Sequence, residues 1–143
     1  MRTVKQLLEV SQSHRLFTVE PTTTVIEVVK LLARENVGAV VVMEDSKLVG
    51  IVSERDVTKK IFLQGSNPAA DRVDQIMTRD VITVSPAEST RGCLVLMTAR
   101  NIRQLPVIEA GHVVGLISLR DIVKDIITAQ DDTIAQLSRY ING

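Results

Sequence analysis

An internal repeat at a constant offset of 65 residues is the feature that most constrains the fold of this chain. Thr18-Val19-Glu20-Pro21 recurs as Thr83-Val84-Ser85-Pro86, and the run Gly50–Asp56 (GIVSERD) recurs as Gly115–Asp121 (GLISLRD). Aligning residues 18–61 with 83–126 needs no gap and gives fourteen identities in 44 positions. The chain of 143 residues therefore encodes two copies of one structural unit.

Each copy predicts the same order of secondary structure, β-α-β-β-α. A short extended segment and a Pro-containing turn precede a helix that ends near Asn36 or Asn101. Two apolar runs joined by a hairpin-type turn follow, and a second helix begins at Ser53 or Ser118. The expected strands are residues 17–19, 39–43 and 48–52, and 82–84, 105–108 and 113–117. The predicted fold class is α/β (α+β), with the two repeats packed as a pseudo-two-fold pair.

The repeats also predict the domain organisation. Residues 1–64 hold an N-terminal segment and the first repeat, 65–75 form a polar linker, 76–130 hold the second repeat, and 131–143 form a C-terminal helical tail. The first helix of each copy is apolar on nearly all sides, so one face can cover its own sheet while the other needs a partner. Because a unit of about 60 residues buries little surface alone, we predict a pseudo-dimer of repeats that dimerises again into a homodimer.

Composition excludes several classes of partner. Seventeen Lys and Arg balance seventeen Asp and Glu, and aromatic residues make up 2% of the chain, which argues against nucleic-acid polymers. One Cys and two distant histidines, His14 and His112, supply neither a disulfide nor a zinc site. The longest apolar run, Val37–Met43, is far shorter than the roughly 20 residues that span a bilayer. These features predict a cytoplasmic protein with no metal and no membrane contact.

The recurring Ser-x-x-Asp has two interpretations. As a helix start, Ser caps the helix and Asp completes a capping box, with no ligand required. However, Arg and Asp recur together in both copies, although a cap requires neither that Arg nor Asp in preference to Glu. A short carboxylate can accept hydrogen bonds from ribose hydroxyls, while Arg and free backbone N–H groups suit a phosphate. The motif is therefore either a cap alone or a ribose-phosphate site.

The recurring motifs also make the sequence resemble a known family. The Thr-Val-x-Pro segments, the Gly-h-h-Ser-x-x-Asp endings, in which h is an apolar residue, and the doubled β-α-β-β-α pattern are similar to tandem CBS domains, a Bateman module. The resemblance covers about residues 3–130. It extends to free-standing bacterial members, which begin like Met1–Leu8 and end like Thr133–Leu137.

The resemblance implies that adenosyl ligands bind in two clefts between the repeats, with the motif Asp on the ribose. The first cleft would comprise Phe17, Val37, Gly38, Ala39, Arg103, Leu116, Ser118, Arg120 and Asp121. The second would comprise Ile51, Ser53, Arg55, Asp56, Thr78, Ile82, Ile102 and Gln104. The family often places a basic residue for phosphate where Arg103 lies, and Gly38 is its counterpart in the other copy. We therefore expect the Asp121 cleft to bind a phosphorylated ligand more tightly.

The sequence leaves three hypotheses for the function of the chain. The leading hypothesis is a non-catalytic sensor in which AMP, ATP, NAD or a related ligand such as S-adenosylmethionine changes the angle between the repeats and an effector protein reads the change. The second is an enzyme that hydrolyses a nucleotide phosphoester, but the spacing supports no nucleophile-base set and no catalytic residue. The third is a structural interaction protein whose clefts stay empty.

Overall fold

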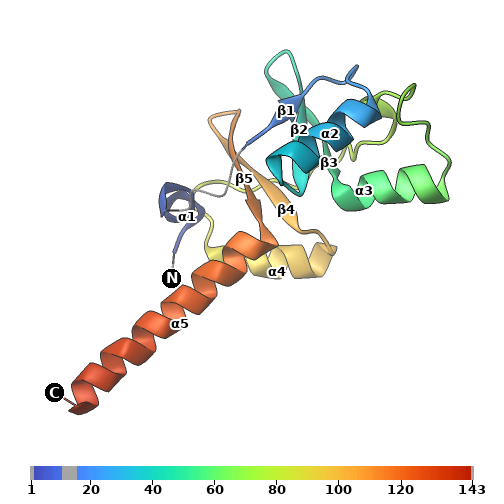
Figure 1. Ribbon diagram of the computed structural model, residues 1–143. Helices are drawn as coiled ribbons and strands as arrows, with labels where there is room; N and C mark the ends of the chain where they lie inside the picture. Colours follow the sequence, from blue (N-terminus) through green and yellow to red (C-terminus); the bar gives the residue numbers. More distant parts are fainter. Residues whose placement is uncertain (1, 11–15, 143) are drawn as a thin grey trace.

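Two halves of like architecture form the body of the molecule, and a long C-terminal helix extends away from it (Figure 1). The computed structural model describes residues 2–10 and 16–142, so His14 lies outside the described residues. The first half contains β1 (Thr18–Val19), α2 (Val25–Glu35), β2 (Ala39–Glu44), β3 (Lys47–Ser53), α3 (Glu54–Thr58) and the π-helical turn η1 (Lys59–Leu63). The second contains α4 (Thr90–Arg100), β4 (Gln104–Glu109), β5 (His112–Ser118) and α5 (Leu119–Asn142). A short helix, α1 (Val4–Val10), precedes the first half, and a 3-10 turn, η2 (Val73–Gln75), precedes the second.

Equivalent residues end equivalent elements in the two halves. Asn36 and Asn101 both close their helices in the left-handed conformation, with φ of 52° and 53°, which a short polar side chain tolerates. Two-residue loops join β2 to β3 and β4 to β5, and all four loop residues have positive φ, as hairpin turns of this length favour. These findings confirm the predicted repeat and the predicted helix ends.

The second sheet is smaller than the sequence predicted. The first sheet has the order β1-β2-β3, with β1 parallel to β2, whereas the second contains only β4 and β5. The expected strand over residues 82–84 is reduced to an isolated bridge between Val84 and Val107. In the first half the Val41 N–H donates to the Phe17 carbonyl at 3.1 Å, and Pro106 is the residue equivalent to Val41. Proline has no N–H to donate, so the third strand cannot extend in the second half.

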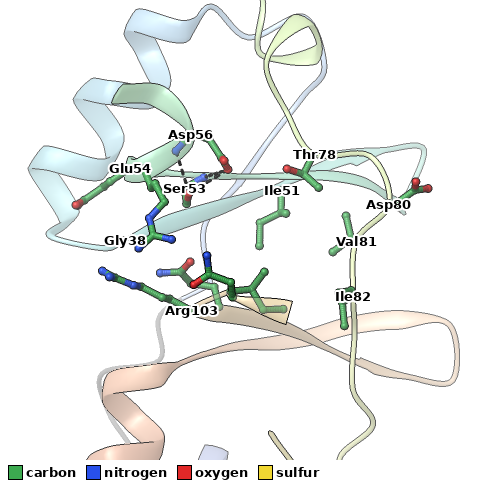
Figure 2. Close-up of a pocket in the computed structure, with 14 residues that line it drawn as sticks. Gly38, Ile51, Ser53, Glu54, Asp56, Thr78, Asp80, Val81, Ile82 and Arg103 are labelled. Atoms are coloured by element: carbon green, nitrogen blue, oxygen red, sulfur yellow. Dashed lines mark hydrogen bonds between the residues drawn. The ribbon is translucent and has the colours of Figure 1, made fainter. Parts of the chain in front are cut away.

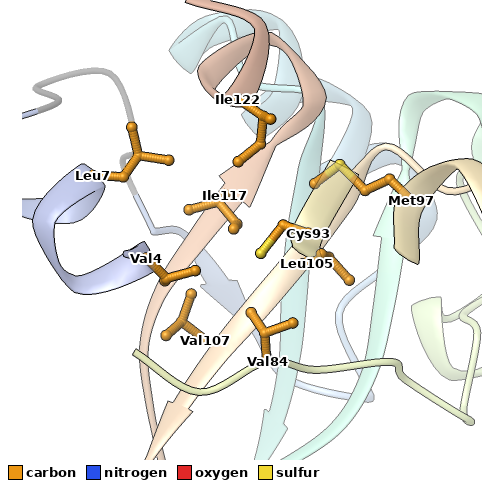
Figure 3. Packing of buried hydrophobic residues seen from close by; sticks show 9 residues of the cluster. All are labelled: Val4, Leu7, Val84, Cys93, Met97, Leu105, Val107, Ile117 and Ile122. Carbon is orange, nitrogen blue, oxygen red and sulfur yellow. The ribbon is translucent and has the colours of Figure 1, made fainter. Parts of the chain in front are cut away.

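Three buried clusters hold the body together. One fills each half between its helices and its sheet, and Figure 3 shows the cluster of the second half. The third joins the halves, because Ala39 and Val41 on β2 pack with Leu116 on β5. The two sheets therefore pack against one another through this third cluster. The structure confirms a mixed α/β fold with paired repeats.

The segment before the second repeat packs on the first repeat. Arg72 forms an isolated bridge with Thr24, the N-cap of α2, and the Val73 N–H donates to the Thr23 carbonyl at 2.7 Å. Val73 and Ile76 are buried in the core of the first half. Part of the stretch that the sequence marked as a polar linker is therefore core.

Residues 3–8, which precede the first repeat, pack on the second repeat in the same way. Thr3 bridges to Ser89, and the Val4 N–H donates to the Glu88 carbonyl at 2.8 Å. Val4 and Leu7 are buried in the core of the second half. We call residues 3–8 and 72–77 the entry segments. Each entry segment crosses to the other repeat, so the repeats exchange their N-terminal ends.

The outer faces of α2 and α4 are only partly covered within one chain. Ile26, Val29 and Leu31 on α2 are half-buried, and Val95 on α4 is 61% exposed. The side chains that face the sheets are buried. The predicted further dimerisation therefore stays a prediction.

One buried carboxylate ties the N-terminus to α5. Arg2 Nε lies 2.8 Å from Oδ1 of Asp125, whose side chain is 6% exposed. We expect Arg2→Gln to lower the free energy of unfolding by about 1–3 kcal/mol, because the carboxylate stays buried without its partner. Urea denaturation measures the change. Lys30→Gln is the matched control, because Lys30 and Glu27 lie 3.9 Å apart and are both exposed, so a change of less than about 0.5 kcal/mol is expected. Equal effects from both variants would contradict the prediction.

Candidate functional site

Two cavities lie between the repeats, and each contains one of the recurring Ser-x-x-Asp motifs. The first, here the Asp56 cavity, has a volume of about 270 Å³. In Figure 2 the polar pair Ser53 and Asp56 lies at one end, Val81 and Ile82 at the other, and Ile51 between them. The eight residues predicted for the second cleft all line this cavity: Ile51, Ser53, Arg55, Asp56, Thr78, Ile82, Ile102 and Gln104.

Ser53 and Asp56 form a reciprocal capping box at the start of α3. The Ser53 N–H and Oγ–H donate to Oδ2 of Asp56 at 3.1 and 3.0 Å, and the Asp56 N–H donates to Ser53 Oγ at 3.2 Å. The cap therefore uses a single carboxylate oxygen. Within the described part of the chain, no hydrogen bond reaches Oδ1 of Asp56. Capping and ligand binding are thus compatible rather than alternatives at this residue.

Ser118 and Asp121 repeat this geometry at the start of α5. The Ser118 N–H and Oγ–H each donate to Oδ2 of Asp121 at 2.9 Å, and the Asp121 N–H donates back to Ser118 Oγ at 3.2 Å. Asp121 is 7% exposed, whereas Asp56 is half-buried. The two motifs therefore hold their carboxylates in the same way but at different depths.

The second cavity, here the Asp121 cavity, has a volume of about 770 Å³, within the range of small-molecule sites. Eight of the nine residues predicted for the first cleft line it: Val37, Gly38, Ala39, Arg103, Leu116, Ser118, Arg120 and Asp121. Phe17 is not among its described lining residues and packs against the core of the first half. The motif of each repeat meets the turn between the first helix and the first hairpin strand of the other repeat, residues 36–39 or 101–104.

The two cavities share a wall. Gly38, Glu54, Arg103 and Gln104 line both. A Cβ atom on Gly38 would lie 3.0 Å from Nε2 of Gln104, so a larger residue would disturb this wall. Arg103 was expected to serve only the Asp121 cavity, but it borders both. Arg103 alone therefore does not make the two sites unequal.

Other charges distinguish the cavities. The described lining of the Asp121 cavity includes the bases Arg103, Arg120 and Lys124 and the acids Glu54 and Asp121. The Asp56 cavity combines the bases Arg55 and Arg103 with three acids, Glu54, Asp56 and Asp80. Opposite charges lower the energy of a bound anion. In their described linings the Asp121 cavity therefore has one more base than acids, and the Asp56 cavity has one more acid than bases.

Sequence reasoning missed several lining residues. Asn36 and Asn101 had been identified only as helix ends, yet the turns that they close line the Asp121 and Asp56 cavities. Their recurrence at the 65-residue offset was the available signal. Lys124 recurs at the same offset as Lys59 but lies beyond the Ser-x-x-Asp motif. Asp80 lies in the connection between the repeats, outside the aligned residues, and gave no signal.

The remaining reactive side chains lie away from the cavities. Cys93 is buried in α4, and burial, with a smaller contribution from the charge of Glu88, raises the pKa of its thiol to about 11. A thiol that stays protonated is a poor nucleophile. Among residues 2–10 and 16–142, no group of three or more His, Cys, Asp or Glu could hold a metal ion. No helix in the same ranges is long and apolar enough to cross a membrane.

Comparison with known proteins agrees with this geometry. The family model described as the CBS domain matches residues 4–63 and 73–128. The mitochondrial CBS domain-containing protein CBSX3 of Arabidopsis thaliana is 36% identical over 125 residues, which are 84% of this chain. The match spans 61% of that protein.

Solved structures share the fold over most of both chains. A signal-transduction protein with CBS domains from Burkholderia ambifaria, described as putative, is 39% identical with a TM-score of 0.85, covering 90% of this chain and 96% of that one. The CBS domain pair of protein MJ0100, solved in complex with 5′-methylthioadenosine and S-adenosyl-L-methionine, is 27% identical with a TM-score of 0.76 and covers 87% and 98% of the two chains. That related pair binds adenosyl ligands.

Proposed function

Because the chain belongs to the CBS-domain family, as a tandem pair of its repeats, we propose that it is a non-catalytic regulatory module. It binds an adenine nucleotide or another adenosyl compound in the cavities between the repeats. AMP, ATP, NAD and S-adenosylmethionine all carry the adenosine that the recurring motif would recognise. The complex of the MJ0100 pair supports this ligand class.

The observation that carries the proposal is the duplicated carboxylate at the cavity wall. At Asp56 the cap occupies Oδ2, and Oδ1 is left to accept hydrogen bonds from vicinal ribose hydroxyls. A charge-assisted hydrogen bond of this kind is about twice as strong as a neutral one. Apolar side chains line both cavities, Ile51 and Ile82 in one and Val37 and Leu116 in the other, and these would enclose the adenine.

The phosphate would lie beside the basic residues. In the Asp121 cavity, Arg120 follows the motif Ser by two positions, and Lys124 lies one turn further along α5. We propose that this cavity binds the phosphorylated ligand more tightly, since its described lining holds more bases than acids. The Asp56 cavity, with Asp80 on its wall, suits an uncharged or positively charged adenosyl group.

Signalling would follow from the position of the cavities. A ligand that touches both repeats changes their relative angle only if it binds one arrangement more tightly than the other. An effector protein would recognise the change in angle between the repeats. Separately, the partly covered faces of α2 and α4 would join two copies of the chain into a homodimer. Small-angle scattering that does not change on ligand binding would contradict this part of the proposal.

The ligand class can be tested directly. Native mass spectrometry of protein purified without added nucleotide should show an adenosyl compound bound to the chain. AMP, ATP, NAD and S-adenosylmethionine should then be compared by thermal unfolding. A ligand at a hundred times its dissociation constant stabilises the folded state by about 2.7 kcal/mol. Unchanged melting temperatures with all four compounds would favour the alternative of empty clefts.

An enzymatic role is the second candidate, and it requires product formation. Prolonged incubation of the protein with ATP or NAD, followed by chromatography, should return the nucleotide intact. Release of phosphate, AMP or nicotinamide at a rate proportional to protein concentration would overturn the non-catalytic proposal.

A further inference from the structure

The apolar side chains of the distal part of α5 are exposed to solvent within one chain. The helix runs from Leu119 to Asn142 and leaves the body of the molecule (Figure 1). Twenty-four residues make a helix about 36 Å long, and every side chain from Ile127 to Ile141 is exposed. Helices of this length are usually stabilised by packing of an apolar face. The described residues of the chain offer this part of α5 nothing to pack against.

The apolar residues of α5 form a continuous stripe with heptad spacing. Positions separated alternately by four and three residues hold Val123, Ile127, Gln130, Ile134, Leu137 and Ile141, here the seam. The exposed fractions of its apolar members lie between 41% and 78%. The opposite side of the helix start faces the body, where Ile122 and Asp125 are buried. An alternating four-three spacing is the pattern of a coiled coil rather than of a helix lying on a sheet.

We propose that α5 pairs with α5 of a second copy of this chain as a parallel, two-stranded coiled coil along the seam. Written as heptads, the seam places isoleucine at all three a positions, Ile127, Ile134 and Ile141, and leucine at the d position 137. Isoleucine at a with leucine at d favours two parallel strands. The polar d residue, Gln130, meets Gln130 of the other copy in this arrangement, which fixes the register.

Charges beside the seam favour the parallel orientation. The flanking e positions are Lys124, Asp131 and Ser138, and the flanking g positions, Ile126, Thr133 and Tyr140, carry no charge. In a parallel pair each g residue meets an e residue of the other helix, so no like charges face each other. An antiparallel pair that used the whole seam would place Asp131 beside Asp131 of the second copy, which is repulsive.

This interface is distinct from the proposed contact of α2 and α4, and it shares only Val123 and the flanking Lys124 with the described lining of the Asp121 cavity. It would hold two bodies at the same end of the coiled coil, leaving the outer faces of α2 and α4 available. Loss of nucleotide binding would not change it, and loss of the coiled coil would leave the Asp56 and Asp121 motifs in place. The two proposals can therefore fail separately.

Sedimentation of the full chain with Ile134→Glu tests the interface. The glutamate carboxylate would be buried at an a position of the coiled coil. The dissociation constant for the pairing of two α5 helices should therefore rise at least tenfold. Gln136→Glu is the matched control, because residue 136 is exposed on the other side of the same turn, and it should sediment as the wild type does. A monomeric wild type, or unchanged association of Ile134→Glu, would overturn the proposal.

Disulfide formation tests the orientation. Leu137→Cys should oxidise to a covalent dimer, since identical d positions face each other in a parallel pair, whereas Gln136→Cys should not. Cys93 is buried, so it does not compete for crosslinking in the folded chain. A Leu137→Cys chain that stays monomeric under oxidation, while an equimolar mixture with Ile127→Cys forms crosslinks, would show an antiparallel pair and overturn the parallel one.

Discussion

Asp121→Ala is expected to weaken AMP binding by about tenfold to more than a hundredfold. The substitution removes a charged acceptor for the ribose hydroxyls, and a hydrogen bond to a charged group contributes about 1.5–3 kcal/mol, with every 1.4 kcal/mol changing affinity tenfold. The same change removes a helix cap and should lower the free energy of unfolding by about 1 kcal/mol. Isothermal titration calorimetry and urea denaturation measure the two effects separately.

Two further variants separate binding from capping and one cavity from the other. Asp121→Asn keeps an oxygen that can accept from Ser118, so its stability should remain near that of the wild type while its AMP affinity falls. Asp56→Ala should weaken AMP binding less, because the described lining of the Asp56 cavity holds more acids than bases. Equal losses at both positions would contradict the inequality of the sites. Lower stability with unchanged affinity in all three variants would reduce the motifs to helix caps.

Leu7→Ala is expected to lower the free energy of unfolding by about 2–5 kcal/mol, as for other buried leucines. Leu7 lies on α1, seven residues from the N-terminus, yet it is 4% exposed in the core of the second half. Truncation leaves a cavity in the buried cluster that α1 shares with the second half. Urea denaturation gives the magnitude, and hydrogen exchange of the backbone amides locates the effect in the strands β4 and β5.

Glu9→Ala is the control for this effect, because Glu9 is exposed on the same helix, and it should change stability by less than about 0.5 kcal/mol. Ile76→Ala, in the other entry segment, should lower protection in β2 and β3 instead. If Leu7→Ala affected β2 and β3 and left β4 and β5 protected, the exchange of entry segments would be contradicted.

Much of the fold follows from the sequence because the repeat is doubled without a gap from residue 18 onward. The entry segments were missed for a physical reason. Residues 3–8 (TVKQLL) and 72–77 (RVDQIM) occupy equivalent places, but their offset is 69, so four extra residues in the connection to β1 put them out of register with the rest. The weakened strand of the second half was missed because the effect of Pro106 depends on its neighbour in the sheet rather than on its own strand.

The lining of the cavities was predicted better than their electrostatics. Residues next to the recurring motifs were found because local sequence fixes their place at a helix start or hairpin. The charge balance of each cavity depends on Lys124 and Asp80 and on the reach of Arg103 into both cavities. The charge balance and the position of Arg103 depend on how the two repeats pack together, and a sequence pattern within one repeat does not determine that packing.

The exchange of entry segments also orders events during synthesis. The first repeat cannot complete its core when its own last helix leaves the ribosome, since Val73 and Ile76 have not yet followed. Residues 3–8, which precede both repeats along the chain, must stay unpacked until β5 exists more than a hundred residues later. Such distant pairings slow folding and leave Val4 and Leu7 exposed in the nascent chain. The two repeats, although duplicates, therefore mature as one cooperative unit, and residues 3–8 are among the last parts to be fixed in place.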